Sequence, residues 1–110
     1  MDFSRWEIWE ADVPYIDNPS KSSIRPVLII EPNRVLVLKI TTHGHSAEAK
    51  PYEYTVFKWQ EAGLTAQSYI QCDKFIELDQ SRFTGRKYGK LLMTDIAGVK
   101  QMMSWHGLKN

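Results

Sequence analysis

Apolar residues are densest between positions 23 and 42, where two apolar runs follow one another closely. The runs cover residues 27–30 and 35–40, and the turn-forming sequence Glu31-Pro32-Asn33 lies between them. A half-exposed strand would alternate polar and apolar residues, whereas these runs are apolar almost throughout. The pattern therefore predicts two neighbouring strands that are buried on both faces.

A polar residue stands at the outer end of each predicted strand. Arg25 precedes the first run, and Thr41 and Thr42 follow the second. In an antiparallel pair the start of one strand lies beside the end of the next, so we expect Arg25 and Thr41 to be spatial neighbours. A fixed cation beside a hydroxyl, held by two rigid strands, is the first candidate for a functional site.

The rest of the pattern predicts short strands and one late helix. Further strands or extended pieces are indicated at residues 7–13, 52–57, 68–72 and 75–78. Polar stretches that we expect to form loops lie between Pro14 and Ile24 and at 43–50, and residues 79–90 are expected to form an exposed turn or hairpin region. The first of these stretches is too long for a tight hairpin.

Two helical signals lie in the second half of the chain. A single turn at residues 59–62 is expected to stop at Gly63. A longer helix is expected to have Thr94 as its N-cap, Asp95 in its first turn and Gly107 as its C-terminal cap. Five or six short strands with one late helix predict a mainly β fold, in which a small, strongly bent sheet or barrel carries a helix packed on it.

Length and cysteine content narrow the class of protein. At 110 residues the chain is close to the commonest domain size, and we expect residues 1–110 to form a single domain. The one cysteine, Cys72, excludes an internal disulfide and suits a reducing compartment. The first residues do not combine a basic region with an apolar one, so we expect no leader sequence, and no apolar run approaches the roughly 18 residues of a membrane span. These features predict a cytoplasmic protein without a membrane partner.

The net charge of +1, with acids and bases interspersed, provides no overall field that would draw nucleic acid to the protein. A polyanion must therefore be held by a local site or by a patch summed over an oligomer. Tyr15 and Tyr52 are the aromatic residues that we expect to stack on unpaired bases. The alternative for most aromatic residues is a place in the core or in a dimer interface.

A histidine pair and the single cysteine could suggest metal binding or thiol catalysis, but structural roles explain both better. The spacing of His43-Gly44-His45 can hold zinc, but no further histidine or cysteine lies nearby, so a loop histidine is the preferred interpretation and no metal site is predicted. Cys72 lies within a predicted strand, where a small buried apolar residue is expected rather than a nucleophile.

Short motifs recur along the chain in a recognisable order. They are Trp9-Glu10-Ala11-Asp12-Val13-Pro14, Arg25-Pro26-Val27-Leu28-Ile29-Ile30, Ile40-Thr41-Thr42, Ala62-Gly63-Leu64 with Ser68, Cys72-Asp73, Leu78-Asp79 and Ser81-Arg82. Together they resemble the MazF/PemK family of bacterial toxin endoribonucleases over nearly the whole chain. The chain departs from the family pattern at Ser23-Ile24, where many members have glycine, and at Gln71, where certain members have arginine.

The resemblance implies a fold, an activity and partners. The implied fold is a small SH3-like or CcdB-like barrel of about five to seven strands with a C-terminal helix. The implied protein is a homodimer that cleaves single-stranded RNA, often mRNA at short motifs, without a metal or other cofactor. A cognate antitoxin, whose flexible tail covers the RNA-binding groove, is implied as a second partner.

The resemblance also implies catalytic roles for Arg25, Thr41 and Asp73. Cleavage of RNA through its own 2'-hydroxyl needs a proton acceptor, a cation for the charge that grows on phosphorus, and a donor for the leaving oxygen. Arg25 can hold two phosphate oxygens in a fixed fork, and Thr41 can donate a hydrogen bond to the same phosphate. Either Asp73 or His43 is expected to accept the proton.

Substrate contacts are expected from Thr42, His43, Tyr15 and Tyr52, and the expected products end in a 2',3'-cyclic phosphate and a 5'-hydroxyl. Two other functions stay open, because fold does not dictate function. One is a non-catalytic binding module or a gyrase-directed toxin of the same barrel fold, and the other is a degenerate family member kept as an interaction partner. An intact Arg25 beside Thr41 favours the ribonuclease, since a gyrase binder has no use for that pair.

Overall fold

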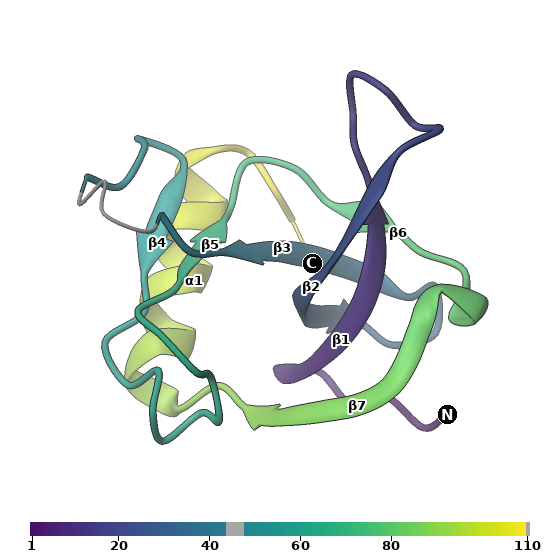
Figure 1. The fold of residues 1–110 in the computed structure, drawn as a ribbon. Helices are drawn as coiled ribbons and strands as arrows, with labels where there is room; N and C mark the ends of the chain where they lie inside the picture. Colours follow the sequence, from purple (N-terminus) through teal and green to yellow (C-terminus); the bar gives the residue numbers. More distant parts are fainter. Residues whose placement is uncertain (44–47, 110) are drawn as a thin grey trace.

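The computed structural model describes residues 1–43 and 48–109 and contains one bent sheet with a C-terminal helix (Figure 1). Its strands, short 3-10 turn and helix are β1 (Glu7–Pro14), β2 (Ser22–Glu31), β3 (Leu36–Thr41), β4 (Glu53–Thr55), β5 (Tyr69–Gln71), β6 (Ile76–Glu77), η1 (Gln80–Arg82), β7 (Phe83–Lys90) and α1 (Met93–Trp105). The sheet has seven antiparallel strands in the order β4-β5-β3-β2-β1-β7, with β6 also paired to β3. The predicted class, a mainly β barrel-like sheet with a C-terminal helix, is confirmed.

The two central strands are the ones that the apolar runs predict. Residues 27–30 of β2 are fully buried, as are Val37, Leu38 and Ile40 of β3. Because successive side chains point to opposite faces, these strands supply two separate cores. One contains Leu28, Leu38 and Ile40 together with Val99 and Met103 of α1, and the other contains Val27 and Val37. Burial on both faces makes β2 and β3 a rigid support for whatever their ends carry.

The segment at 14–24, predicted as a long loop, is mostly hairpin. The β1–β2 ladder continues to the pair Pro14 and Ser22, and the Tyr15 N–H donates to the Lys21 carbonyl at 2.9 Å. Only residues 16–20 form the tip, and Figure 1 shows this hairpin projecting beyond the body of the sheet. The prediction failed because both faces of the projecting ladder meet water, so its polar residues resemble those of a loop.

The segment at 79–90, predicted as an exposed turn or hairpin region, contains a turn and an edge strand. The turn is confined to η1, and Phe83–Lys90 forms β7, an edge strand paired with β1. Most of its side chains are exposed, which explains their polarity. Partners on β1 hold them: Lys87 Nζ lies 2.7 Å from a Glu7 carboxylate oxygen, and the Tyr88 hydroxyl donates to Glu10 at 2.9 Å. Long-range pairing with β1 therefore decides the conformation of this segment.

The C-terminal helix begins differently from the prediction. Its N-cap is Leu92, which makes no side-chain capping bond, and Thr94 is exposed on the first turn. Asp95 faces inward and is fully buried, where it accepts hydrogen bonds from the Tyr54 hydroxyl at 2.6 Å and from the backbone N–H groups of Phe57 and Lys58 at 3.0 and 2.8 Å. The carboxylate thus anchors the helix to the turn after β4 instead of capping the helix.

The two predicted helix stops are confirmed. Gly63 ends the turn after β4 with φ +92°, and a Cβ there would lie 1.9 Å from the Tyr88 carbonyl oxygen. Gly107 has φ +76°, and the next residue, Leu108, donates its N–H to the Met103 carbonyl at 2.9 Å. Within the described part of the chain, no helix has the length and apolar character needed to cross a membrane.

Candidate functional site

Arg25 and Thr41 line one hollow, as the strand pattern predicts. Val27 pairs with Lys39, and extending this antiparallel register by two residues sets Arg25 opposite Thr41. The hollow has a volume of about 310 Å³. Its lining residues are Ile24, Arg25, Pro26, Ile40, Thr41, Thr42 and Ser68. The predicted contact residue Thr42 therefore belongs to the same hollow, at its exposed rim.

The guanidinium of Arg25 is oriented by a serine. Its Nε and Nη2 donate to Ser23 Oγ at 3.0 and 2.7 Å, which leaves three of its five N–H groups for a ligand. Within the described residues, no carboxylate oxygen lies within 4.0 Å of its nitrogens. Arg25 is thus a fixed cation available to an anionic ligand. Ser23, at a position where many family members have glycine, contacts the guanidinium directly, and its place in the sequence pattern does not indicate this contact.

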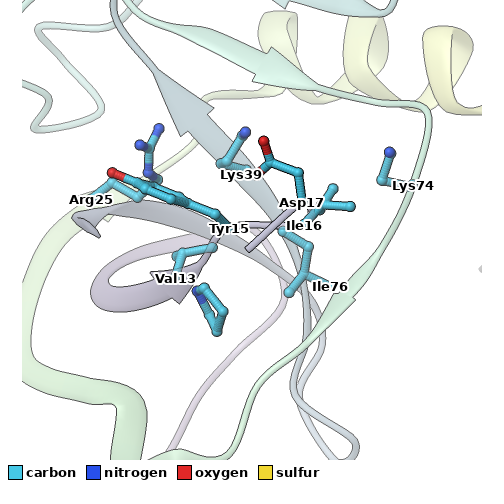
Figure 2. Close-up of a pocket in the computed structure, with 9 residues that line it drawn as sticks. Val13, Tyr15, Ile16, Asp17, Arg25, Lys39, Lys74 and Ile76 are labelled. Carbon is cyan, nitrogen blue, oxygen red and sulfur yellow. The ribbon is translucent and has the colours of Figure 1, made fainter. Parts of the chain in front are cut away.

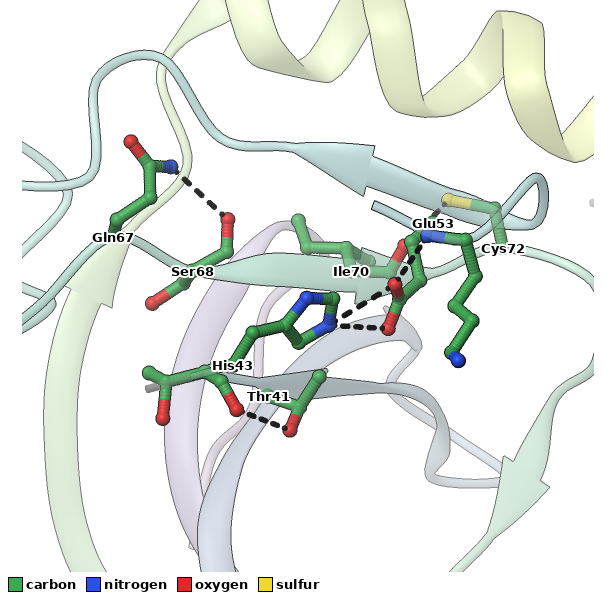
Figure 3. Close-up of polar contacts among 9 residues, drawn as sticks. Thr41, His43, Glu53, Gln67, Ser68, Ile70 and Cys72 are labelled. Atoms are coloured by element: carbon green, nitrogen blue, oxygen red, sulfur yellow. Dashed lines mark hydrogen bonds and ion pairs between the residues drawn. The ribbon is translucent and has the colours of Figure 1, made fainter. Parts of the chain in front are cut away.

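Thr41 offers its hydroxyl at the end of β3. Thr41 Oγ1 donates to the Thr42 carbonyl at 3.3 Å, a long bond that a closer acceptor can replace. Beneath it, Ser68 is nearly fully buried and its hydroxyl donates to the Ala66 carbonyl at 2.8 Å. The hollow therefore presents the Arg25 guanidinium and the Thr41 hydroxyl to a ligand, and Figure 3 shows the bond from Thr41 to the next carbonyl.

His43 is held in a half-buried cluster. Its imidazole stacks on Tyr69, with ring centroids 4.0 Å apart, and Nε2 lies 3.1 Å from the Glu53 carboxylate (Figure 3). Glu53 also accepts the Lys50 N–H at 2.8 Å. Glu53 alternates with Tyr52 and Tyr54 in the sequence, a pattern typical of an exposed strand face, but only 8% of the residue is exposed. No local signal indicates this burial, because its partner lies ten residues earlier. The expected roles of His43 as proton acceptor or substrate contact remain predictions.

Asp73 is not among the residues that line the Arg25 hollow. It is half-buried, and its carboxylate accepts a hydrogen bond from Gln71 Nε2 at 2.8 Å. Gln71 occupies the position where certain family members carry arginine, and here it tethers the aspartate with a neutral donor. Of the three residues predicted as catalytic, the structure brings Arg25 and Thr41 together and leaves Asp73 outside the lining of both hollows, in the connection between β5 and β6.

A second hollow shares Arg25 and lies under the β1–β2 hairpin (Figure 2). It has a volume of about 360 Å³. Its lining residues are Val13, Pro14, Tyr15, Ile16, Asp17, Arg25, Lys39, Lys74 and Ile76. Tyr15 is 42% exposed there, in a position to meet a ligand, whereas Tyr52 is half-buried and lines neither hollow of the described chain.

The described residues contain no group of three or more histidine, cysteine, aspartate or glutamate side chains placed to hold a metal ion. His45, the second residue of the zinc-like spacing, lies outside the described residues. Cys72 is fully buried, and this burial raises the pKa of its thiol to about 12. The expectation that Cys72 is a packed apolar residue is confirmed, because a protonated buried thiol is a poor nucleophile.

Three solved structures are similar to this chain. An endoribonuclease in complex with its cognate antitoxin from a mycobacterial species has a TM-score of 0.69 and 16% identity, covering 93% of this chain and 91% of the other. Another endoribonuclease from a mycobacterial species has a TM-score of 0.71 and 15% identity, covering 100% and 96%. The Mycobacterium tuberculosis toxin MazF-mt6 has a TM-score of 0.63 and 22% identity, covering 93% and 99%. At these identities the likeness establishes the fold.

Sequence comparison supplies the family. No curated protein sequence matches the chain. The sequence profile of the PemK-like, MazF-like toxins of type II toxin–antitoxin systems matches residues 4–105, which is nearly the whole chain and includes both hollows. The bent sheet, the C-terminal helix and this match agree, and the chain belongs to the PemK-like, MazF-like toxin family of type II toxin–antitoxin systems.

Proposed function

We propose that this toxin is an endoribonuclease that cleaves single-stranded RNA at the hollow between β2 and β3. One observation carries the proposal: Arg25 has no carboxylate partner within the described chain and faces the same hollow as the Thr41 hydroxyl. A guanidinium with three uncommitted N–H groups beside a hydroxyl suits a phosphodiester. The two similar endoribonucleases of the same fold support this assignment.

The proposed reaction uses the RNA's own nucleophile. The 2'-oxygen forms a bond to the adjacent phosphorus while its proton passes to Asp73 or His43, and the bond from phosphorus to the 5'-oxygen breaks as that oxygen gains a proton. Arg25 neutralises the charge that grows on the phosphoryl oxygens, and Thr41 donates to one of them. The products end in a 2',3'-cyclic phosphate and a 5'-hydroxyl, and no step requires a metal ion.

Single-stranded RNA fits this surface better than a duplex. Tyr15 is exposed on the hairpin beside Arg25, and an aromatic ring can stack only on a base that is not already stacked between neighbours. With a net charge of +1, the chain gains affinity from local cations and not from an overall field. We therefore propose an extended RNA segment that passes over both hollows.

We also propose two protein partners. A cognate antitoxin would cover this surface, and the support for such a partner is that one endoribonuclease of the same fold was solved in complex with its cognate antitoxin. A second copy of the chain would cover part of the exposed apolar surface. Large apolar side chains that are more than half exposed are Met1, Ile16, Ile24, Phe57, Met93 and Trp105. The antitoxin-free toxin should therefore be a dimer by light scattering, and it would act in the cytoplasm, where mRNA is available.

The test is cleavage of a defined single-stranded RNA by purified, antitoxin-free protein in EDTA, with the product ends identified. Arg25→Ala should abolish cleavage. Arg34→Ala is the matched control, because Arg34 follows the turn at the far end of β2, is 68% exposed and pairs with Glu77. RNA left intact by folded wild-type protein would instead support a binding module, and DNA breaks with intact mRNA would support a gyrase-directed toxin.

A further inference from the structure

The hollow under the hairpin holds more positive charge than the reaction requires. Arg25, Lys39 and Lys74 all line it, against a single carboxylate from Asp17 (Figure 2). No carboxylate oxygen lies within 4.0 Å of the ammonium group of Lys39 or Lys74 among the described residues. Three cations without ion-pair partners therefore converge on one concave surface.

The position of Lys39 is costly for a cation. It interrupts an apolar run, is half-buried between the fully buried Leu38 and Ile40, and pairs across the sheet with Val27. Burial lowers the pKa of Lys39, and the positive charge of Arg25 lowers it further. Glu53 and Asp73 oppose this effect, while Lys74 adds to it. An anionic ligand would offset the free-energy cost of desolvating the Lys39 ammonium group and of its repulsion by Arg25.

The register explains how one ligand would reach both hollows. Arg25, Lys39 and Thr41 project from the same sheet face, because residues two apart on a strand share a face and directly opposed residues share it too. Arg25 lines both hollows, whereas Thr41 lines only the first and Lys39 and Lys74 line only the second. A ligand with anions at regular intervals along a chain matches this row better than an isolated anion does.

We propose that Lys39 and Lys74 bind a second phosphate of the RNA, the internucleotide phosphate adjacent to the one that Arg25 holds. This inference rests on the proposed ribonuclease function and extends its site by one nucleotide. Tyr15 and Ile16 form an apolar wall of the same hollow, against which the base or ribose between the two phosphates would pack. The lysines act on substrate affinity and take no part in proton transfer.

The test measures binding without cleavage. Fluorescence anisotropy would follow a labelled single-stranded oligonucleotide whose 2'-hydroxyls are replaced by hydrogen, titrated with protein between low and high KCl. We expect Lys39→Met and Lys74→Ala each to weaken binding by about fivefold and to reduce the magnitude of the log–log salt slope by about 0.7. Lys100→Ala, which removes an exposed lysine of α1, is the control and should change neither quantity.

A neutral linkage assigns the contact to one phosphate. Methylphosphonate would replace either the linkage 5' or the linkage 3' of the scissile one, in separate oligonucleotides. At one of these positions the methylphosphonate should weaken binding to wild-type protein by about the factor expected for Lys74→Ala. Wild-type protein and Lys74→Ala should then bind this oligonucleotide equally well, since the two changes delete the same contact. Methionine keeps the length and apolar stem of Lys39, and Lys74 is exposed, so folding should survive both substitutions.

The outcomes separate this inference from the proposed function. If Arg25→Ala abolishes cleavage but the lysine variants bind RNA as tightly as wild type with the same salt slope, the second phosphate site is wrong and the ribonuclease stands. The inference is equally wrong if these variants lose affinity only for an acidic antitoxin peptide. If wild-type protein neither binds nor cleaves single-stranded RNA, the proposed function itself fails.

Discussion

The imidazole of His43 stacks on the ring of Tyr69 with an interplanar angle of 13°. This contact attaches His43, the residue after Thr41 and Thr42, to strand β5. The Glu53 carboxylate of β4 contacts Nε2 of the same imidazole. Since Thr41 itself pairs with Tyr69 across the ladder, one cluster joins three strands directly behind the hydroxyl. The rim of the hollow is therefore held by tertiary contacts of a histidine.

This cluster predicts a structural role for His43. Among the described residues, His43→Ala would leave the nearly buried Glu53 carboxylate with the Lys50 N–H as its one remaining partner, and the free energy of unfolding should fall by about 2 kcal/mol in urea denaturation. His43→Gln, which keeps a donor for the carboxylate, should cost less and retain cleavage. A general base typically raises the rate of the chemical step by about 10²- to 10⁴-fold. A loss of that size in folded His43→Gln, with cleavage retained in Asp73→Asn, would make His43 the proton acceptor.

Ser23 is predicted to set the aim of the Arg25 guanidinium. Ser23→Ala removes the acceptor of two N–H groups, so the fork would sample other orientations and kcat/KM for RNA cleavage should fall by about tenfold. The melting temperature should stay within the range of Ser22→Ala, an exposed neighbour on the same strand. Equal cleavage by the two variants would contradict an orienting role for Ser23.

The hydrogen bond from Tyr54 to Asp95 predicts a loss of stability in alkali. Burial, then the bond to Asp95, raises the pKa of the Tyr54 hydroxyl above its ordinary value of 10.0. A raised pKa in the folded state contributes stability that is fully present below the unfolded value and is lost as pH rises above it. Urea midpoints should therefore decline from about pH 10 upward. Tyr54→Phe should be less stable at neutral pH and should show a shallower decline, and a decline identical to that of wild type would exclude Tyr54 as its source.

Gly98 is predicted to be required by the packing of α1. Helix propensity alone predicts that Gly98→Ala stabilises the helix by about 1 kcal/mol. However, a Cβ at this position would lie 2.2 Å from Cε1 of the Tyr54 ring, so the ring or the helix must shift and we expect a loss of about 1–3 kcal/mol. Thermal unfolding of Gly98→Ala, beside Ala97→Ser at the exposed neighbouring position, checks the sign.

Several features were predictable because their causes are local. The uninterrupted apolar runs specify β2 and β3, since residues 27–30 can satisfy that composition only between two cores. Gly63 and Gly107 mark helix stops because positive φ is costly for other residues. The meeting of Arg25 and Thr41 also follows, because a short turn between adjacent antiparallel strands leaves one register in which the apolar residues of both strands are buried.

Tertiary contacts alone decided the features that local patterns misassigned. Phe83–Lys90 has the composition of a loop and became a strand because β1 offers it a ladder, and the 14–24 segment became a hairpin for the same reason. Glu53 and Asp95 are buried carboxylates whose side-chain donors, His43 and Tyr54, lie 10 and 41 residues away, so neither pair falls within one strand or helix.

The sequence by itself determined the two central strands, the fixed cation at the end of one of them and the hydroxyl at the end of the other, because strand pairing and apolar burial follow from neighbouring residues. Only the tertiary structure decided what surrounds that pair. The bend of the sheet carries Lys74 to the hollow of Arg25 and Lys39, and the folding of β4 and β5 over the end of β3 buries Glu53 against His43. Such convergence depends on chain segments distant in sequence, since only packing of the whole sheet brings them within contact distance.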